Sequence, residues 1–221
     1  MIRILWTRPT QDNDRFKAAL PKEITYLTCP CYHIQHLPTP RPQLTIDCVV
    51  VLSPHAVTPK LGHYQAPCFA IGPSTQQALA QYGIEADIPT QADSVHLLQL
   101  LSYQKSQHIL IACGEHTRPW LTQQLIAQGI QVTQWIRYRR VPNPDLSDQL
   151  PSNPQTITHI LATCVTTLHV LANTLPHLDY PLLCLSKRIE KEAKSLGFTH
   201  CFLAPTPSPE GLKQALLATT K

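Results

Sequence analysis

Residues 67–84 read PCFAIGPSTQQALAQYGI, and residues 181–198 read PLLCLSKRIEKEAKSLGF. Each stretch holds a proline, an apolar run typical of a strand, a small-residue turn and a helical pattern that ends at a glycine. Three residues of the first copy have counterparts 114 positions later in the second, at 67 and 181, 72 and 186, and 83 and 197. A period of about half of the 221 residues predicts two similar domains rather than a solenoid of short repeats.

Other segments extend the repeat in the same order. DCVVVLSPHAV (47–57) parallels THILATCVTTL (158–168), and IRILWTRP (2–9) loosely parallels HILIACG (108–114). Strands that alternate with helical patterns favour right-handed crossovers and parallel sheets, with ligands at the carboxyl ends of the strands. The predicted fold class is therefore α/β, with two similar parallel-sheet domains that arose by internal duplication.

The composition is that of a soluble globular protein, with 43% apolar residues and a mean hydropathy of −0.11. Net charge is only +4, and the basic residues are scattered apart from Arg137, Arg139 and Arg140. This pattern argues against a nucleic-acid partner and favours an anionic small ligand.

The first residues, MIRILWTRP, are too short an apolar stretch for a signal peptide or a membrane span, so we expect a cytoplasmic protein without a membrane partner. The eight cysteines should then be reduced thiols. Cys29 and Cys31 have no second cysteine pair at ligand spacing, so no metal site is expected.

Prolines cluster at residues 36–45 and 141–156, and such stretches are stiff and extended. Two connectors predict a discontinuous first domain, residues 1–35 and 142–221, with a second domain inserted as residues 42–135. The connectors are then residues 36–41 and 136–141. As two antiparallel passes they should place Tyr32–Ile34 near Arg137–Val141.

Scarce glycine excludes several kinds of enzyme. The chain contains no GxGxxG, GxxxxGK, GxSxG or HExxH motif, and its histidines show no metal-ligand spacing. If the protein is an enzyme, the class of reaction that remains is one carried out on a bound anionic substrate without a cofactor.

Five motifs resemble the uroporphyrinogen-III synthase family in order and spacing: LSPHAV (52–57), AIGPSTQQAL (70–79), ACGEHTRPWL (112–121), GIQVTQWIRYRR (129–140) and SPEGLKQAL (208–216). TRP (7–9) adds to the likeness, which covers nearly the full chain. The resemblance implies two α/β domains joined by a two-stranded connector. It implies that hydroxymethylbilane loses its ring A hydroxyl, closes through a spiro intermediate and inverts ring D, without cofactor or metal. We expect a monomer, and a transient contact with hydroxymethylbilane synthase is left open.

Tyr138, in WIRYRR, occupies the family's tyrosine position in the connector. The resemblance implies that this phenol assists departure of the substrate hydroxyl, because a phenol protonated at neutral pH can donate a hydrogen bond. The alternative is an aromatic residue that only packs against Trp135 on a strand.

In the second domain we expect Ser53, Pro54, Gly72 and Thr75 to bind substrate carboxylates. They lie at predicted strand-to-helix junctions, where free backbone N–H groups and the helix dipole favour anions. Helix N-capping needs the same residue types at the same place, and one residue can do both.

In the first domain the corresponding substrate-binding residues are Arg8, Thr163, Cys164, Ser186 and Arg188. Here the chain departs from the family, because Cys164 stands where serine is frequent and Ile189 lacks the expected threonine hydroxyl. Ser186 or Arg188 could replace that contact, since guanidinium pairs well with carboxylate. A solvated first helical turn with ordinary charge pairs explains KRIEKEAK (187–194) equally well.

Two other functions compete with this one. A non-catalytic two-lobed binding protein for an anionic small molecule would show the same duplication, although it gives Tyr138 no role. A nucleotide-dependent α/β enzyme is disfavoured because the glycine loops are missing.

Overall fold

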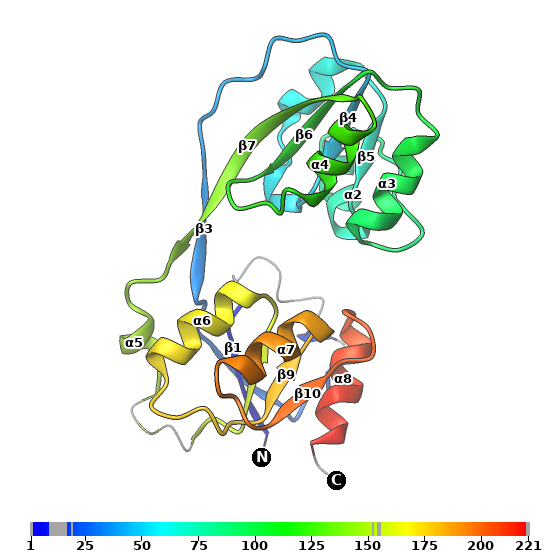
Figure 1. The fold of residues 1–221 in the computed structure, drawn as a ribbon. Helices are drawn as coiled ribbons and strands as arrows, with labels where there is room; N and C mark the ends of the chain where they lie inside the picture. The colour runs from blue at the N-terminus through cyan, green and yellow to red at the C-terminus, as the bar shows by residue number, and fades with distance from the viewer. Residues whose placement is uncertain (1, 9–16, 19, 152, 154–155, 220–221) are drawn as a thin grey trace. The chain divides into compact units, whose positions relative to one another are not determined.

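The computed structural model describes residues 2–8, 17–18, 20–151, 153 and 156–219. The chain divides into two compact units, a first unit of Met1–His33 with Val141–Lys221 and a second unit of Ile34–Arg140. Each unit is built around one five-stranded sheet (Figure 1). Among the described residues, no helix has the length and apolar character needed to cross a membrane.

The second unit's sheet has the strand order β3-β7-β6-β4-β5. Its strands are β3 (Tyr32–His36), β4 (Cys48–Val51), β5 (Cys68–Ala70), β6 (His108–Gly114) and β7 (Gln131–Pro142). The β5-β4-β6-β7 pairs are all parallel. β4 and β5 are buried at every residue, as expected for parallel strands covered on both faces.

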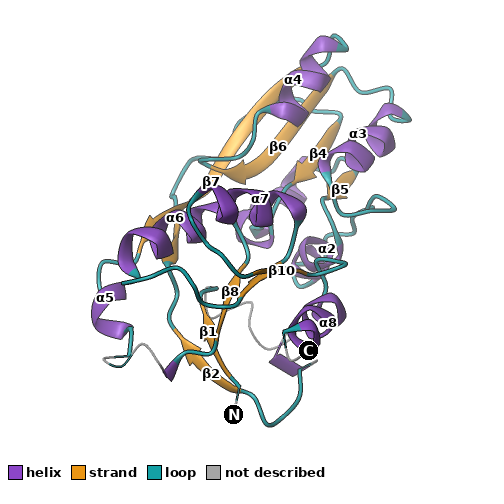
Figure 2. Ribbon diagram, turned by 60° about the horizontal axis from the view of Figure 1, so that its bottom comes forward, coloured by secondary structure: helices purple, strands orange, loops and turns teal. Residues whose placement is uncertain are grey.

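Helices cover both faces of this sheet (Figure 2). On one face Val49, Val51 and Leu110 pack against the 3-10 helices η2 (Pro54–Ala56) and η3 (Pro59–Tyr64) and the helix α2 (Pro73–Ala80). On the other face Val50 and Ile111 pack against α3 (Ser94–Ser102) and α4 (Trp120–Ala127). Adjacent residues of each strand therefore serve opposite halves of the core.

The first unit's sheet has the order β10-β9-β8-β1-β2, and all of its pairs are parallel. The strands are β1 (Arg3–Trp6), β2 (Thr25–Thr28), β8 (His159–Ala162), β9 (Leu182–Cys184) and β10 (Cys201–Leu203). The helices whose full bounds the structure describes are α5 (Leu146–Gln149), α6 (Val165–Thr174), α7 (Lys187–Ser195) and α8 (Pro209–Ala218). Two units of mainly parallel strands with alternating helices confirm the predicted α/β class.

The segment after β4 differs from the strand-then-helix expectation, because two 3-10 helices replace one α-helix. Pro54 and Pro59 each stand at the start of one of these helices. Proline lacks an N–H donor and fits the first turn of a helix but not its interior, so two prolines five residues apart favour two short helices.

The two repeated stretches occupy comparable places. Gly72 is the N-cap of α2 after β5, and Ser186 is the N-cap of α7 after β9. Gly83 and Gly197 follow these helices with φ of 68° and 97°, a left-handed conformation that favours glycine. The order β5-β4-β6-β7 in one sheet also matches β9-β8-β1-β2 in the other. An origin by duplication stays a prediction.

β3 and β7 pair side by side in the second unit's sheet (Figure 1). Leu37 N donates to Arg137 O at 2.8 Å, and Asn143 N donates to Cys31 O at 3.1 Å, so the two passages run antiparallel. The two hydrogen bonds are related by a shift of 106 positions: the donors are residues 37 and 143, and the acceptors are residues 31 and 137. The same shift takes Tyr32 to Tyr138. Residues 136–141, expected as a connector, are the second half of the continuous strand β7.

The Arg137 side chain links β7 to the segment that follows β3. Its Nη1 lies 3.2 Å from Leu37 O, 3.3 Å from Thr39 O and 3.0 Å from Thr39 Oγ1. The guanidinium carbon lies 4.6 Å from the ring centre of Trp135. Burial lowers the pKa of Arg137 from its usual value. The Arg137 side chain therefore donates hydrogen bonds to backbone carbonyls of the facing passage, residues 37–39.

Arg137→Ala should lower the free energy of unfolding by about 2 kcal/mol, because it removes a charged donor from two carbonyls and a hydroxyl. Arg139→Ala is the matched control, since Arg139 is exposed and, among the described residues, hydrogen-bonds only the Gln35 side chain, at 2.7 Å. Urea unfolding of both variants measures the difference. Equal losses would show that Arg137 has no special structural role.

Candidate active site

The predicted residues of the second unit gather at the carboxyl edge of its sheet. Ser53 follows β4, Gly72 follows β5, and Gly114 is the last residue of β6, opposite Tyr138 in β7. The helix η2, which Ser53 precedes, packs against both α2 and β6. Parallel strands place these ends along one edge, so the structure brings Ser53, Pro54, Gly72 and Tyr138 into one neighbourhood.

Ser53 and Pro54 form the cap and first residue of η2. Ser53 Oγ accepts a hydrogen bond from His55 N at 3.2 Å, in the extended conformation of an N-cap residue. The capping alternative therefore describes Ser53 in this structure. Its half-buried hydroxyl keeps lone-pair and donor capacity beyond that one bond.

Gly72 and Thr75 lie at the N-terminus of α2. A Cβ at Gly72 would come within 2.7 Å of Ala92 Cβ, so the close approach of the next segment requires glycine there. Thr75 is fully buried, and its Oγ1 has no hydrogen-bond partner among the described residues. A buried hydroxyl without a partner is uncommon in native proteins. Packing alone does not explain why a hydroxyl is buried at this position.

Tyr138 is only 4% exposed and belongs to the same core cluster as Ala56 and Trp135. The His55 ring meets it edge-on, with centroids 5.5 Å apart and planes at 67°. The Arg140 guanidinium carbon lies 6.0 Å from the ring centre. Its ring is thus fixed by packing, whereas none of the described residues hydrogen-bonds its hydroxyl. The packing alternative accounts for the ring and leaves the hydroxyl unused.

The first unit has a comparable edge. Arg8 follows β1, Thr163 and Cys164 follow β8, and Ser186 follows β9; these three strands are neighbours in the sheet. Thr7 Oγ1 donates to Leu161 O at 2.5 Å, which ties the ends of β1 and β8 together. Arg8 is half-buried just beyond this bond. The structure therefore brings these four residues to one edge.

Cys164 is the N-cap of α6, and its thiol is half-buried. Its Sγ lies 3.8 Å from Tyr32 Oη and 3.3 Å from Thr167 Oγ1. Sequence reasoning did not select Tyr32. The 106-position correspondence between residues 25–36 and 131–142 is the signal that could have found it.

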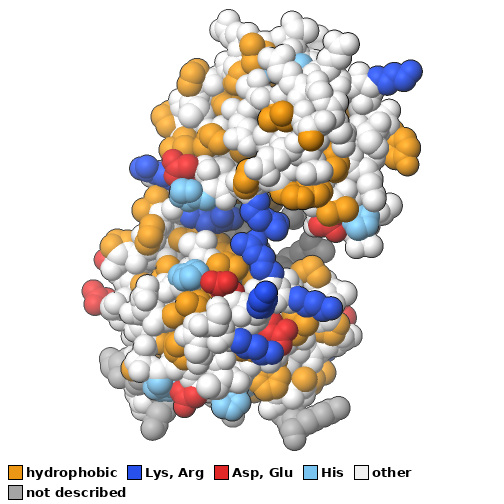
Figure 3. Space-filling view, viewed as in Figure 1, with side chains coloured by type: hydrophobic (Ala, Val, Ile, Leu, Met, Phe, Trp, Pro, Cys, Tyr) orange, Lys and Arg blue, Asp and Glu red, His pale blue; other side chains and the backbone are white. Residues whose placement is uncertain are grey.

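Ser186 caps α7 by accepting from Ile189 N at 3.3 Å. Ile189 itself is 5% exposed, so the residue that replaces the expected threonine packs into the core. Arg188 is exposed. Figure 3 shows lysine and arginine side chains gathered over α7, whose exposed cations are Lys187, Arg188, Lys191 and Lys194. Lys194 pairs with Glu190 at 2.7 Å, which is the ordinary i to i+4 pairing expected for this helix.

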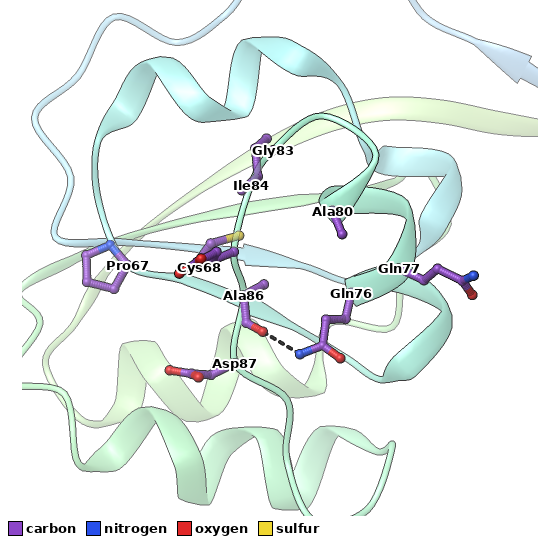
Figure 4. Close-up of a pocket in the computed structure, with 10 residues that line it drawn as sticks. Pro67, Cys68, Gln76, Gln77, Ala80, Gly83, Ile84, Ala86 and Asp87 are labelled. Carbon is purple, nitrogen blue, oxygen red and sulfur yellow. Dashed lines mark hydrogen bonds between the residues drawn. The ribbon is translucent and has the colours of Figure 1, made fainter.

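A cavity of about 760 Å³ lies elsewhere in the second unit (Figure 4). It is lined by Pro67 and Cys68 where β5 begins, by α2, and by the segment after α2, where Gln76 Nε2 donates to Ala86 O at 2.7 Å. None of the predicted site residues lines it. Ligands of parallel α/β sheets commonly bind at the carboxyl ends of the strands, whereas this cavity lies where β5 begins.

Sequence reasoning also missed His55 and Gly114, which contact Tyr138. His55 lies inside the motif LSPHAV and Gly114 inside ACGEHTRPWL. Neither contact could be inferred from the sequence, since both depend on how β6, β7 and η2 meet.

The fold and the two edges define a two-domain parallel α/β protein with helix N-termini suited to anions and a tyrosine on a long strand. The chain belongs to the uroporphyrinogen-III synthase family: the family model described as uroporphyrinogen-III synthase HemD matches residues 22–214. A comparison with curated proteins gave no match.

Solved structures show the same fold. Uroporphyrinogen-III synthetase from Helicobacter pylori superimposes with a TM-score of 0.72 at 15% identity, over 99% of this chain and all of that one. A mutant uroporphyrinogen III synthase from Thermus thermophilus superimposes with a TM-score of 0.62 at 16% identity, over 100% and 98%.

Thr75→Val should leave the stability unchanged or raise it, because the variant removes a buried hydroxyl without a partner. Thr7→Val is the control: Thr7 is equally buried, but its hydroxyl serves Leu161 O, so its loss should cost about 1–2 kcal/mol. Thermal and urea unfolding test both. A clear loss of stability in Thr75→Val would reveal a bond that this arrangement lacks.

Proposed function

We propose that Tyr138 and the carboxyl edges of both sheets perform the uroporphyrinogen-III synthase reaction in this chain. Family membership makes the protein a cyclising hydro-lyase of porphyrin and heme biosynthesis. The single observation that supports our assignment of Tyr138 is its buried, packed ring with a hydroxyl that no described residue hydrogen-bonds. Nothing in the structure favours the non-catalytic binding protein.

The reaction converts hydroxymethylbilane, a linear tetrapyrrole with eight carboxylates, into uroporphyrinogen III. The C–O bond of the ring A hydroxymethyl group breaks, and the departing hydroxide takes up one proton to form water. The proton that the reclosed macrocycle later loses balances this uptake. The azafulvenium cation that remains is attacked by the substituted carbon of ring D, and the spiro intermediate then opens and recloses with ring D inverted. Each step needs a folded substrate, so positioning carries much of the catalysis.

In this proposal Tyr138 donates a hydrogen bond to the departing oxygen. The bond strengthens as negative charge develops on that oxygen, so it stabilises the transition state more than the ground state. A ring confined by Ala56, Trp135 and His55 has little freedom, which keeps the hydroxyl in one direction. The Tyr138 side chain is therefore suited to positioning a single donor.

Substrate carboxylates are bound by backbone groups in this proposal. α2, α6 and α7 begin after Gly72, Cys164 and Ser186, and each has N–H groups in its first turn without a partner inside the helix. The residues assigned to these contacts are Arg8, Ser53, Pro54, Gly72, Thr75, Thr163, Cys164, Ser186 and Arg188. A helix terminus contributes typically about 0.3–1 kcal/mol, so several act together.

We further place the protein in the cytoplasm as a monomer. All eight cysteines are free thiols in the structure, as a reducing compartment would maintain them. A transient contact with hydroxymethylbilane synthase would shorten the time that the unstable bilane spends in solution. Sedimentation and light scattering test the monomer directly.

Tyr138→Phe should lower kcat by about 10- to 100-fold while the melting temperature changes little, because the lost bond forms fully only in the transition state. Tyr64→Phe is the control from the same core cluster: the Tyr64 hydroxyl donates to Pro42 O at 2.7 Å. That variant should lose stability and keep kcat. Full activity of a stable Tyr138→Phe would remove the phenol from the mechanism.

Arg188→Ala should weaken the apparent affinity for hydroxymethylbilane less than about tenfold, because backbone N–H groups provide most of the contacts. Lys191→Ala, one turn further along α7 and also exposed, should have no effect beyond the loss of one charge. Initial rates over a range of substrate concentrations give both values. A hundredfold loss for Arg188→Ala alone would identify a dedicated carboxylate clamp.

A further inference from the structure

We propose that Gly114 is a positioning residue for Tyr138: the missing side chain at residue 114 is the space that the tyrosine ring occupies. The inference rests on the proposed role of Tyr138 and adds a residue that acts through it. The two residues are opposite each other in the β6–β7 pairing.

The contact leaves no room for a side chain. A Cβ at Gly114 would lie 2.6 Å from Cζ of Tyr138, and 2.9 Å from both Cε2 and Oη. A Cβ atom essentially never approaches a non-bonded heavy atom of another segment closer than 3.0 Å. The hydroxyl end of the ring, which carries the proposed chemistry, is the end that rests on Gly114.

Backbone strain does not explain this glycine. The glycines with positive φ are Gly83, Gly129 and Gly197, and Gly114 is not among them. Its backbone conformation is open to residues with side chains. The requirement for glycine at residue 114 therefore comes from the tyrosine ring.

A β-bulge brings the ring onto Gly114. Cys113 pairs with Ile136 and Gly114 pairs with Tyr138, so Arg137 is an extra residue in β7. In a regular strand Trp135 and Tyr138 would point to opposite faces, whereas both belong to the core cluster of Leu110 and Ala112. The bulge thus turns Tyr138 onto the face that η2 covers, as bulges near active sites commonly re-aim a side chain.

The ring has little room to retreat. Glu115 N donates to Tyr138 O at 2.9 Å, and Arg137 is bonded to the facing passage at Leu37 and Thr39. His55 meets the ring edge-on. A methyl group at residue 114 must push the phenol outward, and a displacement of about 1 Å in a positioned group can cost about a hundredfold in rate.

Gly114→Ala should therefore lower kcat about 10- to 100-fold with KM changed less than about threefold. Gly62→Ala is the matched control, since a Cβ there meets Ile84 Cγ1 at an ordinary 3.6 Å in the same unit. In a Tyr138→Phe background, Gly114→Ala should reduce kcat by no more than about twofold, because the donor it displaces is already gone. A Gly114→Ala enzyme with kcat within twofold of the unmodified protein would overturn the inference.

Two measurements do not depend on activity. With tyrosine labelled by ¹³C at Cζ, the resonance that Tyr138→Phe removes should shift in Gly114→Ala and stay in place in Gly62→Ala; an unmoved resonance contradicts the inference.

The second measurement applies if Gly114→Ala has a lowered melting temperature. The melting temperature of Tyr138→Ala is then compared with that of the double variant Tyr138→Ala/Gly114→Ala, and equal values support the inference. If Gly114→Ala lowers the melting temperature as much in Tyr138→Ala as it does with Tyr138 present, the inference is refuted. Full activity of Tyr138→Phe would instead refute the proposed function, while the resonance still tests the contact.

Discussion

Burial of parallel strands on both faces is the constraint on which the rest of this structure depends. Strands such as β4, CVVV, can pair in the middle of a sheet only if helices cover both faces, and each helix must return the chain to the same end of the sheet. The carboxyl ends of the parallel strands therefore lie along one edge of each sheet. Ser53, Gly72 and Gly114 share one such edge because of this rule, although they are far apart in the chain.

The same constraint supports our proposal that a mildly basic protein binds a substrate with eight carboxylates through backbone groups. Helices that follow parallel strands begin at the carboxyl edge, so their free N–H groups and positive dipole ends point to the place where a ligand binds. Cys164 and Ser186 cap two such helices in the first unit, and Gly72 caps one in the second. Arg137, although a cation on the same strand as Tyr138, has a structural role through its contacts with Leu37 and Thr39.

The strand β7 takes part in two different pairings. Its first half, from Gln131 to Ile136, belongs to the parallel ladder, and beyond the bulge at Arg137 it pairs with the passage that contains β3. Tyr138 lies at this transition, where the ladder register changes. The bulge turns Tyr138 onto the face that η2 covers, and none of the described residues hydrogen-bonds its hydroxyl.

The sequence alone determined the α/β class, the strand-and-helix repeat with glycines at residues 83 and 197, and the family, because these depend on local periodicity, turn chemistry and the order of short motifs. It also selected Tyr138 and the junction residues Ser53, Gly72 and Ser186. Only the tertiary structure decided that Thr75 Oγ1 is buried without a partner, that Ile189 packs inside, and that Gly114 lies beneath the Tyr138 ring. The physical reason is that these facts are distances between segments that are far apart in the sequence, and a bulge of one residue reverses which face a side chain takes.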